Sequence, residues 1–216
     1  GIEEGEFRDR ASLALPGRQE ELIAEVASLG KPVVVVLIGG SAVTMSDWLD
    51  DVDAVLAAWY PGEEGGRAVA GVLFGDTNPA GRLPISFPVA EGQLPLVYYH
   101  KPTGRGDDYL DLTGQPLFPF GHGLSYTSFE YSNLTVEPPA FEAGEPGVAR
   151  FTLTNTGDLE GDEVVQLYVH DELASVVRPV MAPSSTDQKR GSPFHPSSVL
   201  PSKSWTTFCL PLLTSS

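Results

Sequence analysis

Two consecutive aspartates and a tyrosine, Asp107, Asp108 and Tyr109, stand in a glycine-rich stretch of this sequence. Carboxylates accept hydrogen bonds from hydroxyl groups, and an aromatic ring offers a flat apolar face on which a sugar ring can stack. These three residues are therefore a candidate sugar subsite. An exposed acidic loop that binds nothing is the alternative, and the residue types alone do not choose between the two.

The other polar residues do not favour metal or nucleotide chemistry. His100, His122, His170 and His195 are far apart and lack a metal-ligand spacing such as two histidines at i and i+4. We expect His122, which stands between two glycines, to have a structural hydrogen-bonding role. The segment Gly39-Gly40-Ser41 matches neither of the usual nucleotide-loop patterns. No metal ion and no organic cofactor is expected.

The charge of the chain narrows the choice of partner. Its 216 residues carry 13 Lys and Arg against 29 Asp and Glu, a formal net charge of −16. Nucleic acids and anionic membranes need clustered cations, so neither is expected as a partner, and a neutral ligand such as a sugar fits better. Cys209 is the only cysteine, which excludes a disulfide within the chain. No run approaches the roughly 18 apolar residues of a membrane span.

The elements that would position these residues begin with an α/β pattern. Residues 16–29 predict a helix with Leu22, Ile23, Val26 and Leu29 on one face and Gly30 as its stop. An unbroken β-branched run at 33–38 is typical of a strand covered on both faces, as in a parallel sheet. A second short strand is predicted at 52–58 and a second helix at 62–75, with inward residues Ala68, Val69, Val72 and Leu73. This order indicates a layered α/β domain.

The pattern changes twice along the rest of the chain. Residues 76–125 are rich in Pro and Gly and predict loops. From residue 129 the hydrophobicity alternates, with strands expected at 151–154 and 164–169 around a turn at 155–158, as at the start of a β-sandwich. The last stretch, 182–216, has scattered Ser and Pro, one acidic residue and no period. We expect it to be disordered, and its loss of acidity suggests a non-native ending.

Three segments together resemble the glycosidases of glycoside hydrolase family 3. They are DRASLALPGRQEELI at 9–23, WYPGEEGGRAVAGVLFGDTNPAGRLPISFP at 59–88, and PLFPFGHGLSYTSFEYSNL at 116–134. The most specific part is the combination of GDTNPAGRLP with the later PFGHGLSYT. The resemblance covers about residues 1–180.

The resemblance implies a particular domain plan. Such enzymes place an amino-terminal barrel before an α/β sandwich and often a fibronectin type III-like domain, and the active site lies between the first two. We therefore expect an α/β sandwich domain with a mostly parallel sheet at 1–100, a loop-rich linker at 101–128, and an incomplete fibronectin type III-like β-sandwich at 129–181. The barrel is expected to be missing from this chain.

The resemblance also implies a pair of catalytic groups. Retaining glycoside hydrolysis uses two carboxyl groups about 5 to 5.5 Å apart, one as nucleophile and one as general acid/base. In this family the nucleophile is an Asp of the barrel, and the acid/base is commonly a Glu of the second domain. Glu6, in GEFRDR, is the candidate acid/base, with Glu4 and Glu3 as alternatives. Asp47 lies in a Ser-Asp-Trp triplet like that around the family's nucleophile, but we interpret it as a helix-start or loop residue.

The activity that the resemblance implies is that of a β-glucosidase, a retaining exo-acting hydrolase of terminal β-glucosides or short oligosaccharides. Without the nucleophile, this chain is expected to be inactive alone. The alternative is a non-catalytic sugar-binding or structural fragment that pairs with a barrel chain, or that self-associates through open sandwich edges. A secreted or periplasmic location is plausible for the full-length enzyme.

Overall fold

The computed structural model describes residues 7, 9–100, 106–140, 147–170, 178–180, 198–200 and 207–209. The chain forms two compact units that alternate along the sequence. The first unit comprises Gly1–Thr77, Leu83–Tyr98 and Gly104–His122. The second comprises Asn78–Arg82, Tyr99–Thr103 and Gly123–Ser216.

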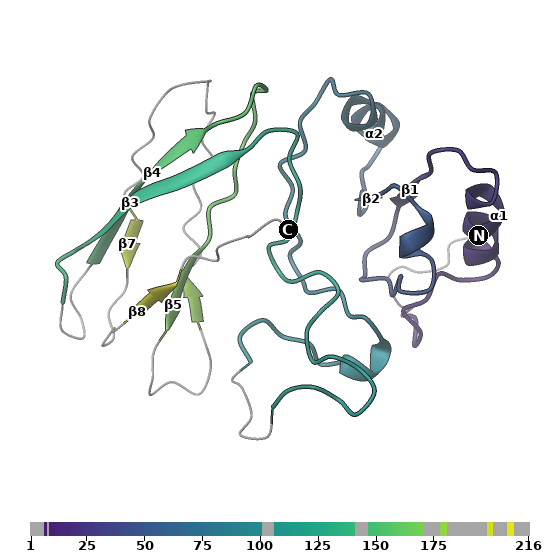
Figure 1. Ribbon diagram of the computed structural model, residues 1–216, viewed down its shortest axis with the longest axis horizontal. Helices are drawn as coiled ribbons and strands as arrows, with labels where there is room; N and C mark the ends of the chain where they lie inside the picture. Colours follow the sequence, from purple (N-terminus) through teal and green to yellow (C-terminus); the bar gives the residue numbers. More distant parts are fainter. Residues whose placement is uncertain are drawn as a thin grey trace. The chain divides into compact units, whose positions relative to one another are not determined.

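The first unit is built on a pair of parallel strands, β1 (Val34–Leu37) and β2 (Ala54–Ala57) (Figure 1). Val35 lies opposite Val55 in their register. The pairing confirms the parallel arrangement that the β-branched run predicted. At the start of β1, Asp53 accepts a hydrogen bond from the Val33 amide at 2.7 Å, so the loop before β2 fixes the entry of β1.

Helix α1 (Gln19–Ala27) contacts the core through one line of side chains only. Of its predicted inward residues only Ile23 is buried, while Leu22 and Leu29 are exposed. Successive helical residues point about 100° apart, so a helix that touches its neighbours narrowly buries Ile23 and leaves Leu22 in solvent. The prediction that all four apolar residues of this helix face the core is therefore wrong. The helix is shorter than the predicted 16–29, because it ends at Ala27 with Ser28 as its C-cap, and Gly30, with a φ of 63°, ends the turn that follows.

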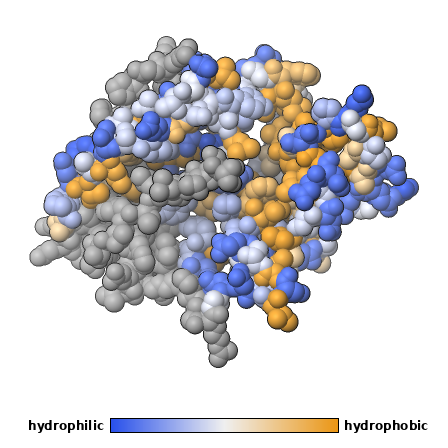
Figure 2. Space-filling model, viewed as in Figure 1, coloured by the Kyte–Doolittle hydropathy of each residue, from blue (hydrophilic) through white to orange (hydrophobic). Residues whose placement is uncertain are grey.

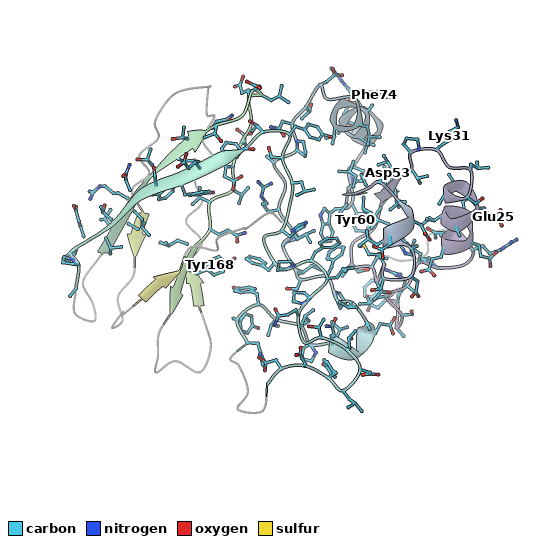
Figure 3. All side chains as sticks on the ribbon, in the orientation of Figure 1. Glu25, Lys31, Asp53, Tyr60, Phe74 and Tyr168 are labelled. Carbon is cyan, nitrogen blue, oxygen red and sulfur yellow. The ribbon has the colours of Figure 1, made fainter. Side chains whose placement is uncertain are left out.

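Helix α2 (Gly65–Leu73) also leaves apolar side chains at the surface. Val69 and Val72 are half-buried, but Ala68 and Leu73 are exposed, which corrects the inward orientation predicted for them. Phe74, at the end of the helix, is 84% exposed and is labelled in Figure 3. Figure 2 shows such apolar atoms on the surface of this unit. The core that the unit does form lies elsewhere, between β1, α1 and the loops, and contains Ile23, Ala42, Val43, Met45, Trp48 and Phe87.

The segment between the two patterned regions is mostly irregular, as predicted. Its described residues contain the single-turn 3₁₀ helix η2 (Glu91–Gln93) and one isolated bridge between Phe87 and Phe118. A similar 3₁₀ turn, η1 (Leu49–Asp51), precedes β2. Because this segment lacks extended ladders, side chains must satisfy much of its backbone.

The second unit consists of antiparallel strands. Strands β3 (Phe129–Glu137) and β4 (Gly147–Asn155) pair along most of their lengths, and β7 (Ser198–Leu200) pairs with the far edge of β4. A second sheet has β5 (Leu167–His170) between β6 (Arg178–Val180) and β8 (Thr207–Cys209). The burial of β4 alternates along its length, which confirms the alternation predicted there.

Strand β5 begins at Leu167, later than the predicted strand at 164–169, and the residues at 160–163 contact the segment at 78–82. A Cβ built on Gly161 would come within 2.3 Å of the Asn78 amide nitrogen. Asn78 donates to the Glu160 carbonyl at 3.1 Å, and Arg82 pairs with Glu163 at 2.5 Å. These contacts connect the irregular segment at 160–163 to Asn78 and Arg82.

The Arg82–Glu163 pair is a nearly buried ion pair, with side-chain exposures of 11% and 14%. Glu163 also accepts a hydrogen bond from the Tyr131 hydroxyl at 2.9 Å. Burial, together with the negative charge of Glu163, raises the pKa of Tyr131, so the phenol stays protonated and remains a donor. The residues Asn78 and Arg82 of the GDTNPAGRLP motif therefore have structural roles in the second unit.

We expect Glu163→Ala to lower the free energy of unfolding by about 3 kcal/mol, because it leaves a nearly buried guanidinium without its counter-charge. The measurement is urea unfolding followed by circular dichroism. The matched control is Glu21→Ala, which breaks the exposed Arg18–Glu21 pair and should cost less than about 1 kcal/mol. Equal losses in the two variants would contradict the structural role of the buried pair.

Candidate functional site

The residues after the candidate acid/base are fixed by an arginine clamp. Glu3, Glu4 and Glu6 themselves lie outside the described residues. Just downstream, Arg10 donates from Nη1 to the Ala14 carbonyl and from Nη2 to Ser41 Oγ, both at 2.8 Å. The first bond closes the segment on itself, and the second ties it to the turn that follows β1. Residues 10–14 thus have a defined position in the first unit.

A cavity of about 300 Å³ lies beside this clamp, at the carboxyl ends of β1 and β2. In open α/β sheets, ligands bind outside the carboxyl ends of the strands. Its lining combines polar groups with apolar and aromatic surface. The lining residues that carry polar or aromatic groups include Arg10, Gln19, Ser41, Trp59, Tyr60 and Phe87.

The aromatic wall of the cavity is held in an unusual backbone conformation. Trp59, the second residue after β2, has a φ of 51°, in the left-handed region that bulky residues rarely adopt. Such a conformation costs of order 1–3 kcal/mol and persists only where the surroundings impose it. Here the Trp59 carbonyl accepts a hydrogen bond from the Gly39 amide at 3.2 Å, and its ring meets Phe87 edge-on at 6.2 Å. Tyr60, labelled in Figure 3, packs on Gly40 so closely that an added Cβ would lie 2.6 Å from the ring.

The loop that carries the candidate sugar subsite is held in shape by its own side chains. Asp108 accepts hydrogen bonds from the Gly114 amide at 2.8 Å and from Thr113 Oγ1 at 3.2 Å. The Tyr109 hydroxyl donates to the Gly92 carbonyl at 3.1 Å. Asp107 is half-buried. A Cβ built on Gly114 would lie 2.1 Å from the Asp107 carbonyl oxygen, so the backbone packs closely there. Asp108 thus has a structural role within the loop, whereas the half-exposed ring of Tyr109 keeps a face toward solvent.

The turn η2 brings the two candidate segments together. Glu91 accepts hydrogen bonds from Ser12 Oγ at 2.6 Å and from the Leu13 amide, so it holds the segment that follows Glu6. Two residues later, Gln93 holds the other segment. Its amide nitrogen donates to the carbonyls of Thr113 and Gln115 at 2.8 and 2.9 Å.

Gln93 is the polar centre of this arrangement, because its side chain is 3% exposed and uses both ends of its amide. The amide oxygen accepts from the Val89 and Ala90 amides at 2.6 and 3.3 Å. One buried side chain therefore connects η2 with the loop at 113–115. Sequence reasoning missed both Glu91 and Gln93, because their partners lie 79 and about 20 residues away and no local pattern marks them.

The other residues considered from the sequence have surface or structural positions. Asp47 is exposed in a turn before η1, while Trp48 beside it is buried in the core. The ring of His122 stacks on Phe118 at 4.8 Å. Among the described residues there is no cluster of His, Cys, Asp or Glu that could hold a metal, and none of their helices is long and apolar enough to cross a membrane.

We expect Gln93→Leu to lower the free energy of unfolding by about 3 kcal/mol, because two carbonyls and two amides that bind this buried side chain lose their partner. Amide hydrogen exchange at Val89 and Ala90 should rise in the same variant. Gln115→Leu is the matched control. Its side chain is exposed, so its effect should stay within about 0.5 kcal/mol. Unchanged exchange at Val89 and Ala90 in Gln93→Leu would contradict the role assigned to Gln93.

Comparison with known proteins gives a consistent result across sequence and structure. The model of the family described as "Glycosyl hydrolase family 3 C-terminal domain" matches residues 1–126. A periplasmic β-glucosidase of Salmonella typhimurium is 42% identical over 185 residues, and a β-xylosidase of Formosa agariphila is 44% identical over 178. The crystal structure of a β-glucosidase from Listeria innocua in complex with glucose superimposes with a TM-score of 0.83 at 35% identity.

These matches cover most of this chain but a small part of each relative. The alignments with the Salmonella and Formosa proteins span 81% of this chain and 24% of those proteins. The Listeria structure covers 92% of this chain, which in turn covers 29% of that structure. The chain thus spans about a quarter of the length of its curated relatives and corresponds to their carboxy-terminal part.

Proposed function

The chain belongs to glycoside hydrolase family 3, and we propose from this that it supplies the carboxy-terminal half of the active site of a retaining β-glucosidase. Relatives named as β-glucosidases and β-xylosidases share its sequence at 42–44% identity. The proposed substrates are terminal β-glucosides or short oligosaccharides. The complete reaction needs a nucleophile that this chain is not expected to contain.

In the proposed mechanism, the carboxylic acid of Glu6 gives its proton to the glycosidic oxygen as the leaving group departs. A barrel Asp attacks the anomeric carbon and forms a glycosyl ester. Glu6, now ionised, removes a proton from water, which hydrolyses that ester. Glu4 and Glu3 remain the alternatives for this role.

The observation that supports this proposal best is the fixed position of the segment after Glu6. Arg10 and Glu91 anchor it from two sides, and a cavity with an aromatic wall lies next to it at the carboxyl ends of two parallel strands. A general acid must be held within hydrogen-bond reach of the bond it protonates. A segment anchored at both 10 and 12–13 is suited to that task.

The loop at 106–115 is proposed as a second wall of the site, through Tyr109. Its hydroxyl is bound within the loop, so a sugar would meet the ring face. Asp107 and Asp108 remain part of the proposed subsite, with Asp108 acting mainly by shaping the loop.

The finer domain plan is also a proposal. We assign residues 1–100 to an α/β sandwich, 101–128 to a linker, 129–181 to a fibronectin type III-like β-sandwich, and 182–216 to a tail of non-native sequence. The expectation that this whole tail is disordered is wrong for its described residues, because β7 and β8 pair with β4 and β5. Two sheets of antiparallel strands support the fibronectin-like assignment. A periplasmic or secreted location is proposed for the whole enzyme, in keeping with its periplasmic relative.

A second candidate function is a structural or sugar-binding module that docks on a barrel chain. The exposed apolar side chains of the first unit favour it, since Leu22, Ile38 and Phe74 are 63%, 68% and 84% exposed. Exposed apolar side chains mark an interaction surface where they gather into one patch. Self-association through the same surface or through the sandwich edges would be the outcome without a partner.

We expect the purified chain alone to leave a chromogenic β-glucoside intact and to hydrolyse it when mixed with a separately made barrel domain of a family 3 enzyme. In the mixture, Glu6→Gln should lower kcat by a factor of about 10² to 10⁴. Glu4→Gln and Glu3→Gln serve as the matched controls and should have little effect.

Hydrolysis by the chain alone, abolished by Glu6→Gln, would overturn the split active site. A large loss in Glu4→Gln with none in Glu6→Gln would move the acid/base role to Glu4. No hydrolysis in the mixture, together with light scattering that shows self-association of the chain, would favour the structural module.

A further inference from the structure

The two candidate segments are held by neighbouring residues of one short turn. Glu91 binds the segment at 12–13, the carbonyl of Gly92 binds Tyr109, and Gln93 binds 113 and 115. Consecutive Cα atoms are about 3.8 Å apart. A displacement of η2 would therefore move both segments together.

The two connections differ in their chemistry. Gln93 is buried, neutral and bonded at both ends of its amide, so it behaves as a rigid part of the core. Glu91 is at the surface, and its carboxylate accepts hydrogen bonds from a hydroxyl and an amide of the other segment. Hydrogen bonds to a charged acceptor are about twice as strong as neutral ones, so the charge of Glu91 matters for this connection.

We propose that η2 is the common anchor of the two walls of the site and that Glu91 is a positioning residue for the segment that follows Glu6. The inference rests on the proposed function only in treating that segment as part of the active site. The anchoring itself is a property of this chain and can be measured without activity. Glu91 acts through Ser12 and Leu13 and does not touch substrate.

The ionisation of Glu91 offers a direct readout. Hydrogen bonds from Ser12 and Leu13 lower the pKa of Glu91 below its ordinary value, against a smaller opposing effect of burial. A carboxyl whose pKa is lower in the folded state stabilises that state above its ordinary pKa, and this stabilisation is lost as the pH falls through the lowered pKa. The groups that face Glu91 and lower its pKa are Ser12, Leu13 and Ala14, all uncharged, so the transition should belong to Glu91 itself.

The experiment is amide NMR on the whole chain, with variants Glu91→Gln, Glu91→Ala and the control Glu25→Gln. Glu25 is exposed on α1 (Figure 3), so Glu25→Gln removes the same charge at a site away from η2. In the unchanged chain, the Leu13 amide shift should follow a single acid transition below the ordinary pKa of a glutamate. Hydrogen exchange at Leu13 should rise about tenfold or more in Glu91→Ala, less in Glu91→Gln, which keeps an acceptor oxygen, and not at all in Glu25→Gln.

Three results would overturn the proposal. The first is a Leu13 amide shift that still titrates in Glu91→Gln. The second is hydrogen exchange at Leu13 that stays at the level of the unchanged chain in both Glu91→Gln and Glu91→Ala. The third is a rise in Leu13 exchange in Glu25→Gln as large as that in Glu91→Ala. A general loss of dispersion in Glu91→Ala would indicate unfolding, and Glu91→Gln then decides. Inactivity of the mixed enzyme would count against the proposed function alone, because the NMR readouts do not depend on it.

Discussion

The buried amide of Gln93 is the interaction on which the irregular half of the first unit depends. Between α2 and β3 the described backbone has no extended ladder, so its amides and carbonyls need partners from side chains. Gln93 satisfies four of them from one position. The loop that carries Tyr109, the turn η2 and the segment beyond Phe87 take their shape around this one side chain, and through Glu91 the arrangement reaches the segment that follows Glu6.

The sequence predicted the elements whose signals are local. The β-branched run of β1, the stop at Gly30 and the alternation of β4 arise from neighbouring residues, and each was found close to its predicted place. The burial of the helices was predicted less well. A periodic apolar face shows which side of a helix can be covered, but how much of it is covered depends on what packs there, and the predicted inward residues Leu22 and Leu73 remain exposed.

The candidate site was less accessible to sequence reasoning, because its parts meet only in three dimensions. Tyr109 was identified by its residue type, but its hydroxyl binds the backbone carbonyl of Gly92, a partner that no residue type indicates. Arg10 and Ser41 are separated by 31 residues, and Ser12 and Glu91 by 79. The family motifs had the opposite difficulty. GDTNPAGRLP was easily recognised, yet its Asn78 and Arg82 serve the second unit, where they bind Glu160 and Glu163.

The route of the backbone limits how this protein can be divided. The chain contributes Asn78–Arg82 and later Tyr99–Thr103 to the second unit, and it returns to the first unit after each, before it enters the second for good at Gly123. A Cβ on Gly123 would lie 2.3 Å from the Gly81 carbonyl oxygen, so the segment at 78–82 is packed tightly against the segment that leads into β3. No single cut of the gene can therefore yield both units whole. A protease that cuts a loop between 83 and 98 would leave Asn78–Arg82 in one piece and the rest of the second unit in the other. During synthesis, Asn78 and Arg82 must wait for their partners Glu160 and Glu163, which the ribosome adds about 80 residues later.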